Sequence, residues 1–343
     1  MWNMGSLKVD GAAVLGPMSG FTSPGYRDFM KPFGVSLSYT VMTSDLGIIH
    51  NHSKTEAYVD FKDNHPTGVQ LYGSDPDTVA KAAEIALRIN KDIDFFDINM
   101  GCPVPKITRN GSGSTLMKDP EICGRMVRAV KDKVDVPVSA KIRLGWSMQT
   151  VNFREVIHEL ESAGVDAICI HPRTKTEGYS GTPHYDMVEN LQEEMTVPLI
   201  VSGNIYLLED AIAAQRTTGA TAVMVARGGV GNPFLVTQID RYFRTGERLP
   251  NPTISQQVDW CLELAEHMIA EKGYDEAMRK FRIYAPKFIA GCHRCRGYRY
   301  DLAVKYKDME SLRSILYDIR DKMGDMRINT YGRPDQDIPS HSS

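Results

Sequence analysis

Short apolar runs recur along the first 228 residues, and helix-like segments separate them. The runs are rich in Val and Ile and do not alternate with polar residues, as expected of strands buried on both faces. Their starts are about 25–40 residues apart, the length of one strand–helix unit. The runs are AAVLGPM (12–18), LSYTVM (37–42), TGVQLYG (67–73), FFDINMG (95–101), VPVSAKIRLG (136–145), AICIHPRT (167–174), PLIVSGN (198–204) and AVMVARG (222–228).

The segments between the runs fit amphipathic helices. Two of them, 75–89 and 119–134, open with Asp-Pro, which is a helix start signal. Eight strand–helix units in series predict an α/β fold, a (β/α)₈ TIM barrel over residues 1–250. The alternative is an open doubly wound sheet, which usually has fewer strands and needs a strand-order switch that sequence cannot show.

The pattern changes after residue 250. The stretch PNPTIS (250–255) is typical of a linker followed by a helix start. From there to Met323 the chain predicts helices without strand runs, so we expect a C-terminal all-helical domain over 251–326. The polar segment 327–343 contains two prolines and predicts a flexible tail.

Composition narrows the class of protein. The chain has 343 residues, of which 42% are hydrophobic, enough for one large domain and a smaller one. No run approaches the roughly 18 apolar residues that cross a bilayer, and the N-terminus lacks a signal-peptide pattern. Six scattered cysteines suit a reducing cytoplasm. We therefore expect a cytoplasmic protein without a membrane partner; its oligomeric state, a monomer included, stays open.

Charge is unevenly distributed. The net charge is −3, yet nine Lys and Arg residues lie between Arg279 and Lys307 against one acid, Asp301. This asymmetry indicates a local polyanion-binding face in the helical domain. On charge alone, a solvated helix face without a partner is an equally good interpretation.

Six apolar runs end in polar residues. In a (β/α)₈ barrel the carboxyl ends of the strands carry the active site, and a buried polar group needs a partner. A bound polar ligand would partner these residues together. They are Gln70, Asn99, Lys141, His171, Asn204 and Arg227.

Glycine-bearing turns follow the seventh and eighth runs, at Ser202-Gly203-Asn204 and Arg227-Gly228-Gly229. This is the usual phosphate site of the fold, although tight turns alone would also use these glycines. The pair favours a phosphorylated cofactor, and flavin mononucleotide (FMN) suits the remaining residues. Lys141 would stabilise charge on the reduced ring.

Cys102 follows the fourth run, between a strand end and Pro103. A thiol with a pKa near 8.5 is mostly protonated at neutral pH and can donate a proton. The alternative, a packed core cysteine, fits this polar loop less well.

These motifs together resemble the tRNA-dihydrouridine synthases, in family order, over roughly residues 11–325. The core NMGCPVPKI (99–107) is the specific part. The others are shared more loosely with related flavin barrels: GPMSGFTSPGYR (16–27), VQLYG (69–73), GSGSTLMKDP (111–120), AKIRLGW (140–146), IHPRT (170–174), SGNI (202–205), VARGGVGNP (225–233) and AMRKF (277–281).

The resemblance implies that NADPH reduces bound FMN, which delivers hydride to C6 of a uridine extruded from tRNA, and that Cys102 protonates C5. Asn99 would lie near the target base. Arg173 and Lys175 would meet RNA, and Arg279 and Lys280 would hold the tRNA backbone. The implied FMN contacts are Pro17, Met18, Gln70, Lys141, His171, Gly203, Asn204, Arg227 and Gly228.

The chain departs from the family pattern at three places: Val41 replaces an acid, Ser23 an Asp, and Pro172 a Gly. These departures leave open the subtype and the uridine that is modified. The pair Cys292 and Cys295 lacks the four ligands of structural zinc, so we predict no metal site.

Two rival functions stay open. One is a flavin barrel enzyme for a small molecule, of the dihydroorotate or enoate type, and the other is a catalytically silent RNA-binding protein.

Overall fold

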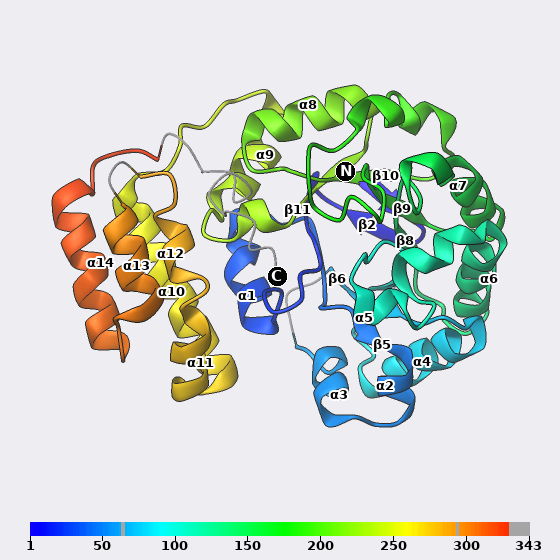
Figure 1. Cartoon of the computed structure of the whole chain (residues 1–343), viewed down its shortest axis with the longest axis horizontal. Helices are drawn as coiled ribbons and strands as arrows, with labels where there is room; N and C mark the ends of the chain where they lie inside the picture. The colour runs from blue at the N-terminus through cyan, green and yellow to red at the C-terminus, as the bar shows by residue number, and fades with distance from the viewer. Residues whose placement is uncertain (63–65, 293–294, 329–343) are drawn as a thin grey trace.

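Eight parallel strands form a closed barrel, and a group of helices lies beside it (Figure 1). The computed structural model describes residues 1–62, 66–292 and 295–328. Each of the eight predicted runs contains one barrel strand. The strands are β3 (Ala13–Leu15), β4 (Leu37–Tyr39), β6 (Thr67–Tyr72), β7 (Phe95–Asn99), β8 (Val138–Arg143), β9 (Ala167–His171), β10 (Leu199–Ser202) and β11 (Ala222–Val225).

The ring closes because β3 pairs with both β4 and β11, and β4 pairs with β6. A short strand, β5 (Thr43–Ser44), extends the edge of β6. This closure confirms the (β/α)₈ barrel and rules out the open doubly wound sheet.

Alternate residues of each strand point into the barrel. Near the amino ends these inward side chains are apolar, and Tyr39, Phe95 and Cys169 belong to one buried cluster. Towards the carboxyl ends they become polar: Asn99 lies opposite Lys141, and Arg143 opposite His171. The barrel is therefore filled by apolar packing at one end and carries polar groups at the other.

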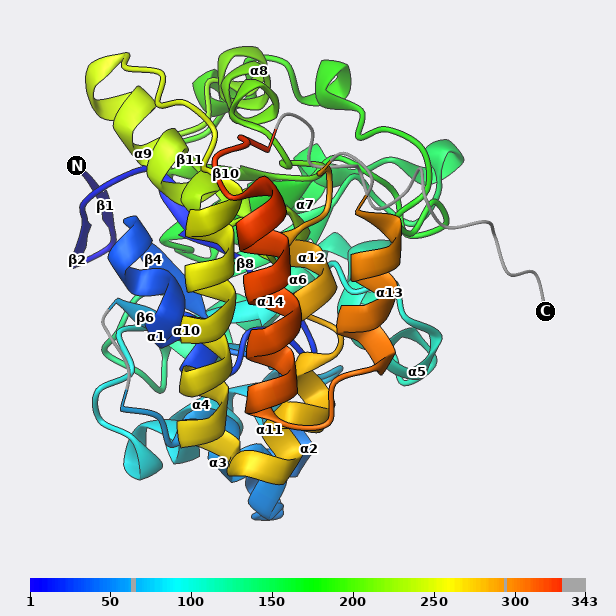
Figure 2. The same cartoon turned by 90° about the vertical axis from the view of Figure 1, so that its left-hand side faces the viewer.

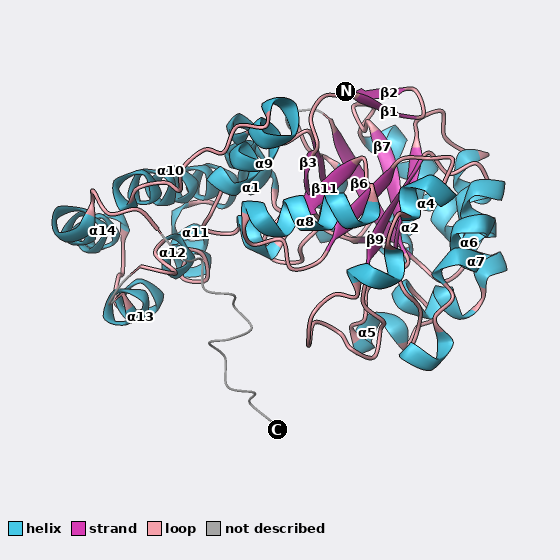
Figure 3. Cartoon of the chain, turned by 90° about the horizontal axis from the view of Figure 1, so that it is seen from above, coloured by secondary structure: helices cyan, strands magenta, loops and turns pink. Residues whose placement is uncertain are grey.

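A two-stranded antiparallel hairpin closes the apolar end (Figure 3). Its strands are β1 (Trp2–Met4) and β2 (Leu7–Val9), and Met4 and Val9 join the buried inner cluster. Gly5, with φ of 55°, makes the turn. This hairpin was not predicted from the sequence.

Helices surround the barrel as the sequence predicts. Asp75 and Asp119 cap the two helices that open with Asp-Pro, accepting from the backbone N–H of Thr78 and Ile122. The helices are α1 (Pro24–Met30), α2 (Asp45–Ile49), α3 (Ser53–Val59), α4 (Pro76–Ile89), α5 (Pro105–Thr108), α6 (Pro120–Lys131), α7 (Phe153–Ser162), α8 (Leu208–Thr218) and α9 (Phe234–Thr245). Short 3₁₀ helices are η1 (Lys31–Phe33), η2 (Gly113–Lys118), η3 (Met148–Thr150), η4 (Tyr185–Val188), η5 (Leu191–Glu194) and η6 (Arg227–Gly229).

The predicted C-terminal helical region is present. It consists of α10 (Ile254–Lys272), α11 (Tyr274–Phe281), α12 (Ala285–Phe288), α13 (Arg296–Val304) and α14 (Met309–Met323). Thr253 and Gln256 form a capping box at its start. In the described part of the chain, no helix combines the length and apolar character needed to cross a membrane.

Helix α10 packs against both α1 and α14 (Figure 2). One continuous buried cluster runs from the barrel into these helices. Because the two parts share this core, the predicted domain boundary between residues 250 and 251 stays a prediction. The tail predicted at 327–343 lies outside the described residues from 329 onwards.

Candidate active site at the mouth of the barrel

A cavity of about 360 Å³ opens at the carboxyl ends of the strands. Cys102 and Asn99 line it, as does every residue predicted to contact the cofactor. The latter are Pro17, Met18, Gln70, Lys141, His171, Gly203, Asn204, Arg227 and Gly228. The structure thus brings these sequence positions together at one site.

The cavity is strongly cationic. Lys141, Arg143 and Arg227 line it, and among the described residues its lining contains no Asp or Glu. Burial lowers the pKa of His171 well below its usual value, and the surrounding cations, including Arg173, lower it further. The His171 imidazole is therefore neutral at pH 7, and the site favours an anionic, electron-rich ligand.

The two glycine turns after β10 and β11 pack directly against each other. A Cβ on Gly228 would lie 1.9 Å from the Ile205 carbonyl oxygen, and Gly203 has φ of 123°. Over the described residues, the backbone N–H groups of Asn204 and Gly228 have no internal acceptor. Free N–H groups beside Arg227 suit a phosphate, so these residues fit the phosphate end of FMN.

A chain of hydrogen bonds runs from the barrel interior to the Cys102 loop. Asp97, which sequence analysis missed, accepts from Gln70 Nε2 at 2.7 Å and from Ser139 Oγ at 2.7 Å. Gln70 Oε1 accepts from Asn99 Nδ2 at 2.9 Å. Asn99 Oδ1 then accepts from the Cys102 backbone N–H at 2.9 Å. The Asp97 carboxylate thereby sets the orientation of both amides, and Asn99 holds the loop that carries Cys102.

Cys102 is half-buried at the cavity wall. Its carbonyl oxygen accepts from both the N–H and the hydroxyl of Ser114. Burial raises the pKa of the Cys102 thiol, and the Val104 N–H, Arg143 and Lys141 oppose this rise only in part. The thiol is therefore protonated at neutral pH and available as an acid.

Arg143 is a second residue that sequence analysis missed. Its buried guanidinium donates to the carbonyl oxygens of Gly101 at 2.7 Å, Thr174 at 2.9 Å and Gly178 at 2.7 Å. It therefore joins the Cys102 loop to the loop after β9. Its position two residues after Lys141 on one strand was the available signal, because period-2 spacing places both side chains inward.

Arg173 and Lys175 were predicted to meet the substrate, and the two side chains lie in different surroundings. Arg173 has no exposed surface, and it donates to the Ser180 and Gly181 carbonyls and to Asn204 Oδ1. Arg173 thus joins the loop after β9 to the turn at Asn204. Lys175 lies on the rim of the barrel, with Nζ 4.4 Å from the Trp146 ring centroid. Their contact with substrate stays a prediction.

Arg279 and Lys280 lie outside the mouth cavity, exposed on α11. Arg279 lines a second hollow of about 340 Å³ with Tyr274, Arg282 and Lys307. Lys280 is ion-paired with Glu276 one turn earlier. The hollow is thus lined by three basic side chains and one acid, Asp275; Arg282 directly follows α11, and Lys307 precedes α14.

The helical region holds the first loop of the barrel. The Tyr284 hydroxyl donates to the Gly20 and Phe21 carbonyl oxygens, and Phe21 lines the cavity. Ser23 Oγ donates to Glu271 of α10 at 2.6 Å. An Asp at position 23 would place two carboxylates next to each other. The serine that replaces it here is therefore compatible with Glu271.

The remaining cysteine pair carries no metal site in the described residues. There, no group of three or more His, Cys, Asp or Glu side chains could hold a metal ion. The neighbouring Cys292 lowers the pKa of the Cys295 thiol. His293 and Arg294, which lie between the two cysteines in the sequence, are outside the described residues.

The free energy of unfolding of the Asp97→Asn variant is expected to increase relative to that of the wild type as pH rises. Burial raises the Asp97 pKa from 3.8 to about 6, partly offset by Gln70, Ser139 and Lys141. The folded state thus binds the proton more tightly than the unfolded state, and wild-type stability falls as pH rises through this window. The shift corresponds to about 3 kcal/mol, which asparagine removes.

Urea unfolding of both proteins at pH 4.5 and 7.5 measures the part of this difference that falls between those pH values, about 2 kcal/mol. The Ser139→Ala variant keeps the carboxyl group and loses a hydrogen bond that lowers its pKa, so its stability should fall with pH at least as much as that of the wild type. A difference in unfolding free energy that is the same at both pH values would contradict the raised Asp97 pKa.

The sequence model of the family described as "Dihydrouridine synthase (Dus)" matches residues 14–320. A "Probable tRNA-dihydrouridine synthase 1" from Synechocystis sp. is 35% identical over 79% of this chain and 76% of its own length. A "Probable tRNA-dihydrouridine synthase" from Rickettsia conorii is 33% identical over 78% and 81%. "tRNA-dihydrouridine synthase B" from Pseudomonas aeruginosa is 29% identical over 86% and 89%.

Proposed function

Because this chain belongs to the dihydrouridine synthase family, we propose that it reduces the C5=C6 bond of specific uridines in tRNA to 5,6-dihydrouridine. We further propose FMN as its bound cofactor and NADPH as the electron donor. The observation that carries the proposal is the cationic cavity at the barrel mouth, with a protonated thiol in its wall.

The residues of the cavity fit the two ends of FMN. The turns at Asn204 and Gly228, with Arg227, would hold the phosphate. Lys141 and Gln70 would face the polar edge of the ring, and neutral His171 would donate a hydrogen bond. The bound, reduced flavin would supply a hydride to C6 of the uracil.

Cys102 completes the reaction from the cavity wall. When C6 has been reduced, C5 needs a proton, and the Cys102 thiol carries one at neutral pH. Asn99 and Ser114 fix the backbone on both sides of this residue, through its N–H and its carbonyl oxygen. Asn99 thus lines the cavity that would receive the target base, and it also holds the loop that carries Cys102.

The substrate is proposed to be folded tRNA held by two parts of the chain. The barrel, residues 1–250, would hold the cofactor and the extruded uridine, since a base inside a helix cannot reach such a cavity. The helical region, 251–326, would bind the RNA backbone through Arg279 and Lys280. A cytoplasmic location follows from this substrate and stays a prediction.

Purified protein tests the proposal in two steps. We expect flavin absorbance from the protein as isolated, or after addition of FMN. We then expect dihydrouridine in unmodified tRNA incubated with the protein and NADPH, mapped by position along the RNA; NADH in a parallel reaction tests the choice of donor.

The rival functions give different results. Protein that binds tRNA but takes up no FMN would support a silent RNA-binding protein. Reduction of a small enoate or of dihydroorotate-type substrates, with tRNA left unchanged, would support the small-molecule alternative.

A further inference from the structure

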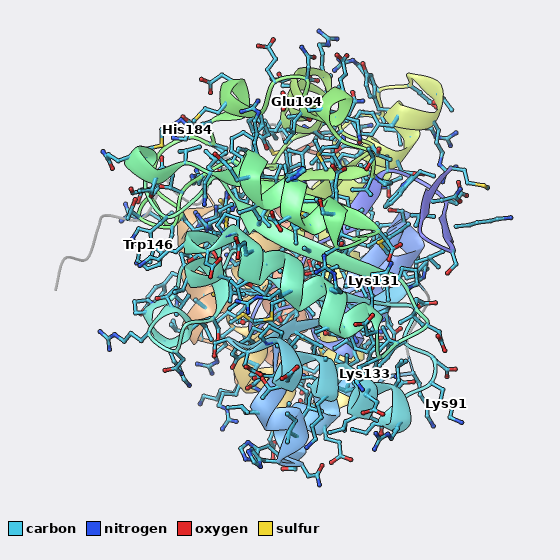
Figure 4. The ribbon with its side chains drawn as sticks, turned by 90° about the vertical axis from the view of Figure 1, so that its right-hand side faces the viewer. Lys91, Lys131, Lys133, Trp146, His184 and Glu194 are labelled. Atoms are coloured by element: carbon cyan, nitrogen blue, oxygen red, sulfur yellow. The ribbon has the colours of Figure 1, made fainter. Side chains whose placement is uncertain are left out.

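A tryptophan that holds two lysines lies on the rim of the barrel, outside the cavity. Lys118 Nζ lies 3.5 Å from the Trp146 ring centroid, and Lys175 Nζ lies 4.4 Å from it. Both distances are within the range of cation–π attraction, about 6 Å. Three segments meet here: the end of η2, the loop after β8 and the loop after β9. Figure 4 shows Trp146 on the side of the molecule opposite the β1–β2 hairpin.

This cluster is tied to the Cys102 loop from two directions. Trp146 follows Arg143 by three residues, a reach of at most about 10 Å, and Arg143 Nε donates to the Gly101 carbonyl. Lys118 follows Ser114 by four residues of η2, about 8 Å along a 3₁₀ helix, and Ser114 donates to the Cys102 carbonyl. Both lysines therefore lie in segments that are hydrogen-bonded to the Cys102 loop or to Arg143, which itself binds that loop.

The charge of the two lysines is not compensated. Within the described ranges, neither ammonium group forms an ion pair. The acids nearest in sequence are engaged elsewhere: Asp119 caps α6, and Glu177 accepts from Thr174 and His184. Two like charges held on one ring repel each other, so an anion placed against both would stabilise the cluster.

We propose that Lys118 and Lys175, held in place by Trp146, bind the phosphodiester backbone of the RNA strand that flanks the nucleotide in the cavity. The inference rests on the proposed function, because that function places a nucleotide next to the cluster. A nucleotide inside the mouth necessarily leaves its neighbouring phosphates at the rim. Lysines are point-charge partners for such phosphates, and Trp146 is a positioning residue for the two ammonium groups.

The test measures binding of unmodified tRNA by the full chain over a series of salt concentrations. Lys118→Gln with Lys175→Gln is expected to weaken binding at least tenfold and to reduce the slope of log affinity against log salt by about 1.5. Trp146→Ala is expected to weaken binding, whereas Trp146→Phe restores most of it because phenylalanine keeps an aromatic face.

The matched control is Lys91→Gln with Lys133→Gln. These two lysines are exposed and lie away from Trp146 on the barrel (Figure 4). Equal losses in the control and in the rim variant, or an unchanged salt slope in the rim variant, would overturn the inference. Failure of the wild-type protein to bind tRNA at all would instead remove the proposed function, so the two failures are distinguishable.

Discussion

Cys102→Ala is expected to abolish dihydrouridine formation while the protein keeps its flavin and oxidises NADPH. The thiol lies in the cavity wall and keeps its proton at neutral pH, because burial raises its pKa. Loss of a positioned acid costs about 10²–10⁴-fold in rate. Alanine leaves the backbone bonds of residue 102 to Asn99 and Ser114 intact, so the cavity should keep its shape.

The measurement is the dihydrouridine content of tRNA after a fixed time, alongside NADPH oxidation and flavin absorbance. Cys292→Ala is the matched control, since it removes a half-buried thiol that does not line the cavity. Full product yield from Cys102→Ala would exclude this cysteine as the proton donor.

The raised thiol pKa also predicts a pH profile for the wild-type enzyme. Product formation should be level through neutral pH and should fall on the alkaline side as the thiol loses its proton. Activity that increases with pH over this range would indicate that the thiolate is the working form.

The barrel was predictable because its strands are buried on both faces. Each of the eight apolar runs is long enough to stand out from the amphipathic helices around it, and each contains a strand. The β1–β2 hairpin was missed because its strands have three residues each, too short for a periodic signal. Gly5-Ser6 between two short runs was the local turn signal that could have indicated it.

Site residues that end a strand were predictable. The residues that hydrogen-bond them or their loops were less so. Lys141 and His171 interrupt apolar runs and were found for that reason. Asp97 lies two residues before Asn99 and Arg143 two after Lys141, so strand alternation indicates that both face inward. The buried surroundings of Arg173 could not be predicted, because β9 ends at His171 and beyond a strand end the alternation no longer fixes the direction of a side chain.

Arg279→Glu with Lys280→Glu is expected to cause the largest loss of tRNA affinity. Both side chains are exposed on α11, whose buried face consists of Ala277, Met278 and Phe281, so the helix should fold unchanged. Reversing two positive charges adds repulsion to the lost attraction, and we expect about a hundredfold weaker binding at moderate salt.

Arg279 is expected to account for most of this effect. Lys280 is ion-paired with Glu276, whereas Arg279 lines the basic hollow with Arg282 and Lys307. Single variants separate the two contributions by affinity and by salt slope. Lys91→Glu with Lys133→Glu provides the control for total charge, and flavin content checks that the cavity is intact. Affinity that is unchanged in the Arg279 and Lys280 variants would mean that the RNA-binding face lies elsewhere, since a surface that holds phosphates must respond to reversal of its charge.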